Sequence, residues 1–409
     1  MIAGITSPKA FRLLLGIFSL LGGVLVISGC EADSYPESLS YPLRSDPLVM
    51  KVPTDESAQP TQFDLPGTLT SLIEQINEKK GQTFSPADLD SKKRDSFEKT
   101  LETLFGTPAH PKVGGIDDAT RDALKLDEAT LTKGSGLYRR HCLHCHGVSG
   151  DGRGPTAAWV NPHPRDYRRG IFKFTSTAGS SDRKPRRDDL LRTLRQGIEG
   201  TSMPTFGLLS NDELEALASY VIHLSLRGQT EYGTMLVFLD KSQSPEFAEP
   251  SSPDPVAEEM KGRLALYAKD HWVQTAQPIP VVEYAVKDQA ASVAAGHKIF
   301  KTIGCLGCHL NYGRKDNLKF DEWGTIVRPA NLTTGVYRGG RRPIDIYWRI
   351  HAGINGAQMP SAKDALEAIK KDAIWDLVNF VQALPYPAML PESKEHGYIR
   401  TEIYGGETK

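Results

Sequence analysis

Two copies of one short motif constrain this 409-residue chain more than any other feature of its sequence. The first copy reads CLHCH at residues 142–146, and the second reads CLGCH at 305–309. Each copy places two thiols three positions apart and an imidazole directly after the second thiol. Because these groups recur in the same order, the motif indicates that one kind of chemical group is bound twice.

Other roles of paired cysteines do not account for the histidine. A disulfide between such close cysteines would leave the imidazole without a function. A zinc ribbon needs two cysteine pairs about 15–20 residues apart, whereas 159 residues separate the two pairs here. A thioredoxin-type redox pair needs a βαβ context, and the local pattern around both motifs is helical.

Covalent attachment of c-type haem uses all three side chains of the motif. Two thiols add to the two vinyl groups of the porphyrin, so they must lie one helical turn apart, and the following imidazole becomes the proximal ligand of the iron. The sequence therefore predicts two covalently bound haem c groups. The expected attachment residues and proximal ligands are Cys142, Cys145 and His146 in the first copy and Cys305, Cys308 and His309 in the second.

A longer internal repeat supplies candidates for the sixth iron ligand. The segment GIEGTSMP at 197–204 matches GINGAQMP at 353–360, so Met203 and Met359 occupy equivalent places. A methionine in such a loop can be core filler, but thioether sulfur suits haem iron and raises its potential. We therefore expect both methionines to be axial ligands.

Two prolines recur between each motif and its methionine loop. Pro164 begins PRDYRRGIF, and Pro329 begins the matching PANLTTGVY. Ordinary loop prolines would fit this pattern. A backbone carbonyl near each position would, however, accept a hydrogen bond from Nδ1 of the proximal histidine and fix the orientation of its ring. Pro164 and Pro329 are therefore expected in the segments that support the two imidazoles.

With an opening helix before each motif and an amphipathic closing helix, the sequence resembles a tandem of class I c-type cytochromes. The resemblance implies an all-α fold of two cytochrome c-like helical domains. It implies that the terminal helices cross at Gly134 and Gly296, against Tyr220 and against Trp375 or Phe380 respectively.

Two departures from that pattern affect the second copy. Leu310 stands where the first copy has a glycine after the proximal histidine, and one extra residue precedes Cys305. Both departures concern the loops around the second haem rather than its ligands.

The first thirty residues read as an export signal. Lys9 and Arg12 precede an apolar run of about 16 residues, which is short for a membrane-spanning helix. The run ends in VISGC, which resembles a bacterial lipobox, so Cys30 is expected to be lipidated. An uncleaved N-terminal anchor is the alternative. Either reading predicts a protein of the bacterial cell envelope, exported to the periplasmic side and anchored to the membrane.

The regions outside the repeat are predicted to be mostly connecting segments. An apolar stripe predicts a helix over 95–105, and a second helix is expected at 69–80. The acidic, proline-rich stretch at 240–260 predicts an extended linker without a core. The expected organisation is a signal and lipobox at 1–30, a tether with a small helical region at 31–125, cytochrome c-like domains at 126–232 and 291–388, a linker at 233–290 and a tail at 389–409.

Charge is divided between these regions. Residues 131–232 carry 15 basic and 10 acidic side chains, and residues 291–390 carry 13 basic and 8 acidic ones. Basic domains predict redox protein partners with acidic docking faces. The exported location excludes nucleic acid, so the basic run at 183–195 is expected to be a solvated or docking face. Four further histidines are not expected to be iron ligands: His163, His223 and His297 are expected at the surface, and His351 at the surface or facing a haem propionate.

These features predict an electron carrier rather than an enzyme. Two six-coordinate irons leave no position for a substrate, so we expect no catalytic residue, and the leading hypothesis is a membrane-tethered dihaem cytochrome c between respiratory-chain partners. A cytochrome subunit of a larger oxidase or quinol-oxidising complex needs the same domains. A dihaem peroxidase would need one open or displaceable iron position, which a methionine in both loops disfavours.

The lipobox hypothesis makes a direct prediction for Cys30. Replacing it (Cys30→Ala) should release the protein from the membrane fraction or leave an unprocessed precursor, because no thiol remains to be acylated. Mass spectrometry of the mature N-terminus checks this. A wild-type protein that keeps Met1 and carries no acyl chain would instead indicate a helical anchor.

Overall fold

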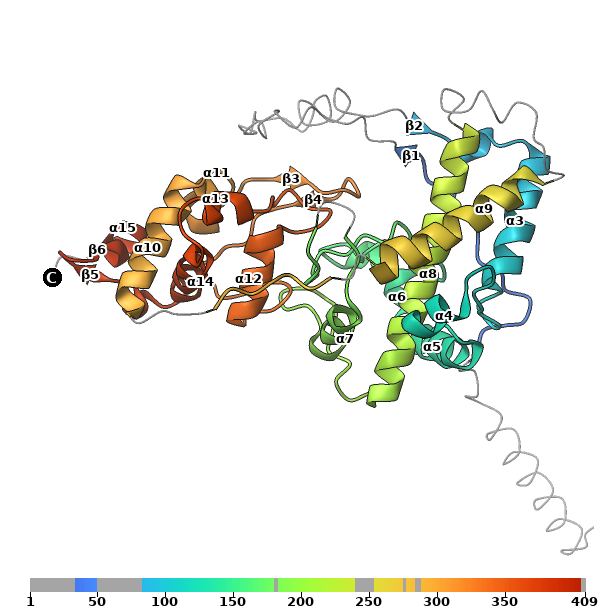
Figure 1. The fold of residues 1–409 in the computed structure, drawn as a ribbon, viewed down its shortest axis with the longest axis horizontal. Helices are drawn as coiled ribbons and strands as arrows, with labels where there is room; N and C mark the ends of the chain where they lie inside the picture. Colours follow the sequence, from blue (N-terminus) through green and yellow to red (C-terminus); the bar gives the residue numbers. More distant parts are fainter. Residues whose placement is uncertain are drawn as a thin grey trace, which may run out of the picture.

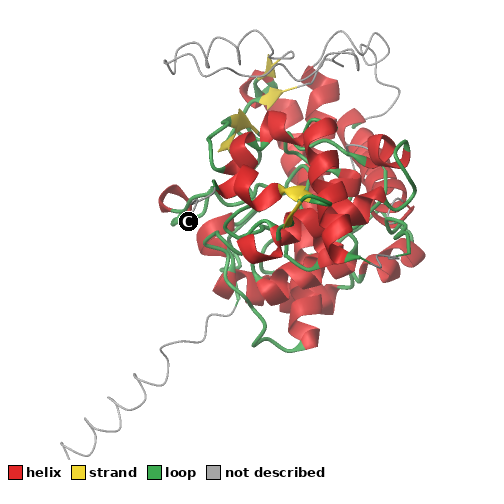
Figure 2. Cartoon of the chain, turned by 90° about the vertical axis from the view of Figure 1, so that its left-hand side faces the viewer, coloured by secondary structure: helices red, strands yellow, loops and turns green. Residues whose placement is uncertain are grey.

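The computed structural model describes residues 34–49, 83–179, 183–239, 254–274, 277–283 and 288–405. Helices dominate these residues, and their strands form short antiparallel pairs (Figures 1 and 2). This agrees with the expected all-α class. The predicted signal with Cys30, the predicted helix at 69–80 and most of the expected linker at 240–260 lie outside the described residues.

Two helical bodies lie along the long axis of the molecule (Figure 1). The N-terminal body comprises the described residues of 34–274 and the C-terminal body those of 277–405, and each has its own hydrophobic core. The N-terminal body contains β1 (Leu48–Val49), β2 (Thr83–Phe84), η1 (Pro86–Asp88), α3 (Ser91–Phe105), α4 (Asp118–Leu124), α5 (Glu128–His141), α6 (Leu143–His146), η2 (Ala157–Trp159), α7 (Arg187–Gln196), α8 (Asn211–Leu239), α9 (Pro255–Leu266) and the π-helix η4 (Tyr267–Gln274). The C-terminal body contains α10 (Gln289–Thr302), α11 (Cys305–Cys308), η5 (Leu310–Gly313), β3 (Lys319–Phe320), β4 (Ile326–Val327), α12 (Pro343–Ala352), α13 (Lys363–Glu367), α14 (Ala373–Ala383), η6 (Pro387–Met389), β5 (Glu392–Ser393), β6 (Gly397–Tyr398) and α15 (Ile399–Tyr404).

In the N-terminal body, α5 crosses α8 at a glycine. A Cβ atom at Gly134 would collide with the carbonyl oxygen of Ala216 and would lie 2.9 Å from the Cβ of Tyr220. Only glycine permits so close an approach of two helices. The crossing therefore occurs against Tyr220, where the resemblance to cytochromes places it.

The C-terminal body repeats this crossing with α10 and α14. A Cβ atom at Gly296 would collide with the carbonyl oxygen of Asp376 and would lie 2.7 Å from the Cβ of Phe380. Of the two expected partners, Phe380 lies at the crossing. Trp375 instead packs on Tyr347 of α12, with ring centroids 4.8 Å apart.

The N-terminal body is larger than the expected domain at 126–232, because the expected linker at 233–290 is partly helical. Helix α8 continues to Leu239, and α9 with η4 packs against α8 and α3. The buried side chains of α9 and η4 recur every four residues and face the core: Val256, Met260, Leu264, Ala268 and Trp272. The prediction of a linker without a core is therefore wrong for 255–274.

Local chemistry explains how a helix begins inside this acidic, proline-rich sequence. Pro255 occupies the first turn of α9, where its missing N–H costs nothing. The Asp254 side chain caps the helix by accepting a hydrogen bond from the backbone N–H of Ala257 at 3.1 Å. The average composition of 240–260 predicts a linker, because it does not show the helix start at Asp254 and Pro255 or the apolar spacing that follows.

The expected tether at 31–125 also belongs largely to the core. Helix α3 buries Phe97, Leu101, Leu104 and Phe105, which confirms the predicted stripe. Residues 34–49 pack on α8, where the backbone N–H of Arg44 donates to the Glu231 carboxylate at 2.6 Å. An irregular, solvated tether is therefore wrong for the described part of this region.

The predicted polar tail at 389–409 folds back as well. Leu390, Ile399 and Ile403 are buried in the core of the C-terminal body. The β5–β6 pair and α15 therefore extend that body to residue 404. The three buried apolar side chains attach this otherwise polar segment to the core.

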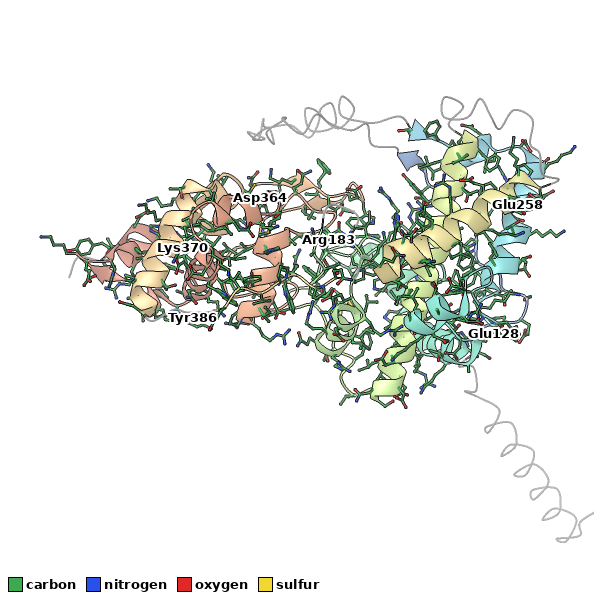
Figure 3. The ribbon with its side chains drawn as sticks, in the orientation of Figure 1. Glu128, Arg183, Glu258, Asp364, Lys370 and Tyr386 are labelled. Carbon is green, nitrogen blue, oxygen red and sulfur yellow. The ribbon has the colours of Figure 1, made fainter. Side chains whose placement is uncertain are left out.

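Two arginines of the basic run at 183–195, Arg183 and Arg192, lie where the two bodies meet. Arg183 lies between them in Figure 3 and donates to the carbonyl of Gly353 at 3.0 Å, while the Asn355 amide donates to the carbonyl of Arg183 at 3.0 Å. The guanidinium of Arg192 lies 4.9 Å from the ring centroid of Trp348. The expectation of a solvated or docking face is therefore wrong for these residues, because intramolecular carbonyl and aromatic groups hold their charges. Within the described ranges, no helix combines the length and the apolar character that crossing a bilayer would take.

The α5–α8 crossing predicts that Gly134→Ala lowers the free energy of unfolding by about 1–3 kcal/mol, as overpacking of a close contact does. The matched control is Gly262→Ala on α9, where an added Cβ meets nothing within 4 Å. That change should raise the free energy of unfolding by up to about 1 kcal/mol, because alanine favours the helix. Urea unfolding of the full chain followed by circular dichroism measures both. Equal free energies of unfolding for the two variants would contradict the prediction that the crossing requires glycine at position 134.

Candidate haem sites

The first motif forms a single helical turn directly after α5. The backbone N–H of Cys142 donates to Tyr138 at 2.8 Å, and that of His146 donates to the carbonyl of Cys142 at 2.9 Å. The opening helix thus runs into α6 and carries both thiols and the imidazole on one short, fixed segment. The hydroxyl of Tyr138 donates to the carbonyl of Gly147 at 2.9 Å and fixes the end of this turn.

His146 has one ring nitrogen committed to the backbone. Its Nδ1 lies 3.1 Å from the carbonyl oxygen of Arg165, to which it donates. Burial lowers the pKa of His146 to about 4, so the imidazole is neutral. A neutral ring that donates through Nδ1 leaves the lone pair of Nε2 for a metal.

The second motif reaches the same arrangement through a different loop. Helix α11 carries both thiols, and Nδ1 of His309 lies 3.1 Å from the carbonyl oxygen of Ala330, to which it donates. Burial lowers the pKa of His309 as well.

The two sequence departures are absorbed in this loop. The extra residue lengthens the turn between α10 and α11, where Gly304 has a φ of 90°. After the histidine, Asn311 and Tyr312 take left-handed backbone angles, with φ of 48° and 59°. These angles replace the turn that Gly147 makes in the first copy with a φ of 72°.

The carbonyls that support the imidazoles lie one residue after the predicted prolines. Arg165 follows Pro164, and Ala330 follows Pro329. The sequence repeat indicated the segments, but it did not specify which peptide would face the ring. Arg165 and Ala330 are thus the site residues that sequence reasoning missed.

The four thiols of the motifs are free in the structure. Burial raises the pKa of Cys142 to about 12 and that of Cys305 to about 11. A reactive redox cysteine needs a lowered pKa, so these environments do not favour a thioredoxin-type pair.

The two methionine loops have the same backbone geometry. In the first, the N–H of Ile198 donates to the carbonyl of Met203 at 3.1 Å, and in the second the N–H of Ile354 donates to that of Met359 at 3.0 Å. Gly197 and Gly353 begin the loops with φ of 67° and 70°. An added Cβ would lie 2.7 Å and 2.5 Å, respectively, from the methionine carbonyl oxygens, so glycine is required at both loop starts.

The donor set of each site fits a covalently bound haem with two axial ligands. Met203 and Cys142 pack against the core of the N-terminal body, and Met359 and Cys305 pack against that of the C-terminal body. Each body thus supplies two thiols, one free imidazole nitrogen and one half-buried thioether. The apolar surroundings suit a porphyrin, and the soft sulfur suits its iron.

Of the four histidines expected at the surface, three are buried. His223 is fully buried and its Nε2 lies 3.0 Å from the carbonyl of Phe105, while His297 is buried beside the Tyr312 hydroxyl at 3.0 Å. His351 is buried and stacks on Tyr347. Of the four, only His163 is exposed. A carbonyl of α3 contacts His223 and aromatic side chains surround His297, whereas His351 stacks on Tyr347 of its own helix. A short repeat reveals none of these contacts.

One part of the chain matches a known protein family. Residues 129–221 match the family described as cytochrome c oxidase, cbb3-type, subunit III. The matched span runs from the start of α5 through the first motif and Met203 into α8. This part of the chain is a c-type cytochrome domain with covalently bound haem, and such a domain transfers electrons.

Two further comparisons concern curated proteins and solved structures. No curated protein matches it. Among solved structures it is similar to a chain of a reducing HAO-like protein complex from Kuenenia stuttgartiensis, at 23% identity and a TM-score of 0.44, over 62% of this chain and 95% of the other.

The equivalent loops predict equivalent behaviour of Met203→His and Met359→His. Each variant should keep a six-coordinate, low-spin iron but lower the potential of one haem, because nitrogen stabilises ferric iron relative to thioether. The charge-transfer band of ferric methionine-ligated haem should fall by half in each variant. Met389→His, at an exposed methionine outside the loops, should leave the band unchanged. A full-strength band in either loop variant would show that its methionine is core filler.

Proposed function

We propose that the protein is a membrane-tethered dihaem cytochrome c that carries single electrons between respiratory-chain partners. The observation that carries this proposal is the repetition of a whole site. In each body a Cys-x-x-Cys-His turn, a backbone acceptor for Nδ1 and a glycine-started methionine loop recur in the same order. A single haem domain would not need a second copy of all three.

Two cytochrome c-like domains follow from this repetition. The first has its repeat at 126–232 and adds α3, α4, α9 and η4 to its core. The second has its repeat at 291–388 and adds α15. The cores and the glycine crossings are separate in the two bodies, which supports one haem for each.

The chain's own residues then set the conditions for electron transfer. The carbonyls of Arg165 and Ala330 hold each imidazole as the tautomer with a free Nε2. Met203 and Met359 would be the second protein ligands of the two haem irons, and the surrounding apolar side chains would exclude water. Haem, when bound, supplies a one-electron couple. Because a histidine and a methionine of the chain would hold each haem iron, the protein would act as an electron carrier and not as an enzyme.

Export and membrane attachment belong to the same proposal. They are supported by the apolar run and VISGC at the N-terminus, and by the attachment of haem c, which occurs outside the cytoplasm. Arg140, His144 and Arg153 are exposed around the first motif and fit a redox partner with an acidic docking face. The periplasmic side of the cell envelope is therefore the proposed location.

A second candidate is a cytochrome subunit of a larger oxidase or quinol-oxidising complex. The observation that favours it is the match of 129–221 to the family of an oxidase subunit. Both candidates use the same haem chemistry, and co-purification in detergent distinguishes them. A dihaem peroxidase would instead show a high-spin iron in the half-reduced protein.

The decisive experiment counts haem groups. The wild-type chain should carry two covalent haems, measured as the ratio of pyridine haemochrome to protein. The double variants Cys142→Ala/Cys145→Ala and Cys305→Ala/Cys308→Ala should each carry one, because each removes the thiols of one site. A wild-type ratio of one haem for each chain would contradict the dihaem proposal. In that case the double variant that loses all haem would identify the occupied motif.

A further inference from the structure

The backbone that supports the first imidazole is held from the other body. The carbonyl of Arg165 accepts the hydrogen bond from His146 Nδ1 at 3.1 Å. The carbonyl of the next residue, Asp166, accepts a hydrogen bond from the indole N–H of Trp323 at 2.8 Å. Trp323 lies in the turn between β3 and β4 of the C-terminal body, so two successive peptide units connect the support of His146 to that turn.

The side chain of Arg165 makes a second connection to the same turn. Its guanidinium carbon lies 3.5 Å from the ring centroid of Trp323. Its Nη1 lies 3.6 Å from the buried carboxylate of Asp321, which also pairs with Lys173 at 3.0 Å. Arg165 is therefore held by stacking and by charge as well as through its backbone.

The turn is rigid on its own side. The other carboxylate oxygen of Asp321 accepts hydrogen bonds from the backbone N–H groups of Trp323 at 3.1 Å and Thr325 at 2.9 Å. The β3–β4 pair closes it in an antiparallel register, with Lys319 opposite Val327 and Phe320 opposite Ile326.

The methionine loop of the C-terminal body holds the turn from behind. The backbone N–H of Glu322 donates to the carbonyl of Gly356 at 2.9 Å, and the Gln358 amide donates to the carbonyl of Phe320 at 3.0 Å. A Cβ atom at Gly356 would lie 2.5 Å from the Trp323 ring. Trp323 is thus packed between the loop that carries Met359 and the backbone that supports His146.

The second site is supported from within its own body. A Cβ atom at Gly313 would collide with the carbonyl oxygen of Ala330, which accepts from His309. The acceptor of His309 therefore rests on the loop that directly follows its motif, whereas the acceptor segment of His146 rests on another body.

We propose that Trp323 is a positioning residue for the first haem site. With Asp321, it fixes the 165–166 backbone from the C-terminal body and thereby sets the orientation and basicity of the His146 imidazole. The inference rests on the proposed function, because it requires a haem on His146. It makes the properties of the first haem depend on a turn of the second domain.

The test is Trp323→Phe in the full-length holoprotein, which removes the indole N–H but keeps an aromatic ring and every charge. A less firmly held acceptor weakens the Nδ1–H···O bond, so the imidazole donates less electron density to iron. The potential of the first haem should rise, and the pattern of its hyperfine-shifted haem methyl resonances should change. The second haem should change less than the first, because the indole N–H that is removed donates to Asp166, and phenylalanine keeps a ring against the Met359 loop.

The matched control is Trp375→Phe. Its indole N–H also donates to a backbone carbonyl, that of Val282, at 2.8 Å, but inside the C-terminal body. This variant should leave the first haem unchanged. Asp321→Asn is a second variant on the proposed path, and it should also raise the potential of the first haem, because it loosens the turn and leaves Arg165 and Lys173 without their carboxylate.

Both Trp323→Phe and Asp321→Asn must retain two haems for each chain. If they do so and leave the potential and resonances of the first haem unchanged, the positioning role is overturned. A wild-type chain without haem on Cys142 and Cys145 would instead refute the proposed function, and haem counting detects that before any potential is measured.

Discussion

A neutral imidazole that donates its Nδ1–H to a backbone carbonyl presents a single nitrogen to a metal, and both motif histidines are held in this way. This bond requires the chain to return to the motif about twenty residues later. The return is possible because glycines line the approach. A Cβ at Gly152 would lie 2.6 Å from the carbonyl oxygen of Pro164, and a Cβ at Gly313 would collide with that of Ala330. The ligand geometry therefore depends on backbone packing, and the helix crossings at Gly134 and Gly296 hold the core on which that packing rests.

The two bodies are joined through their ligand loops as well as through the covalent chain. A Cβ at Gly200, in the loop of Met203, would lie 2.8 Å from the side chain of Val336 in the C-terminal body. A Cβ at Gly356, in the loop of Met359, would lie 2.9 Å from Ile171 in the N-terminal body. Each methionine loop therefore contacts the opposite body. Much of the positive charge between the sites serves this junction, since Arg183 and Arg192 contact the other body there.

The sequence predicted those parts of the structure in which a few residues at fixed spacing determine the local geometry. The motif turns, the methionine loops, the helix α3 and the two glycine crossings are of this kind. It failed where tertiary contacts decide. The apolar side chains from Val256 to Trp272 follow a helical spacing, but the prolines and acidic residues before them led to the prediction of a linker. Arg183 and His223 looked polar enough for the surface, yet each lies within hydrogen-bond distance of a backbone carbonyl from a distant segment. The predicted prolines, Pro164 and Pro329, lie one residue before the hydrogen-bond acceptors Arg165 and Ala330. A repeated sequence does not specify which peptide carbonyl faces the imidazole.

In the proposed dihaem carrier, two haems with the same axial ligands would differ in potential only through their surroundings, and the surroundings of the two motif histidines differ in charge. Beside the support of His146 lie Arg165, Lys173 and the buried carboxylate of Asp321. Burial lowers the pKa of Arg165 to about 10 and that of Lys173 to about 8, so additional positive charge is costly there. Oxidation of a haem at this site adds one more positive charge, and the cations therefore favour the ferrous state. The support of His309 instead rests on the backbone of Gly313. The junction between the bodies thus joins them and also makes the charge around the two sites unequal. The proposed carrier needs such a difference if an electron is to pass from one haem to the next in a fixed direction.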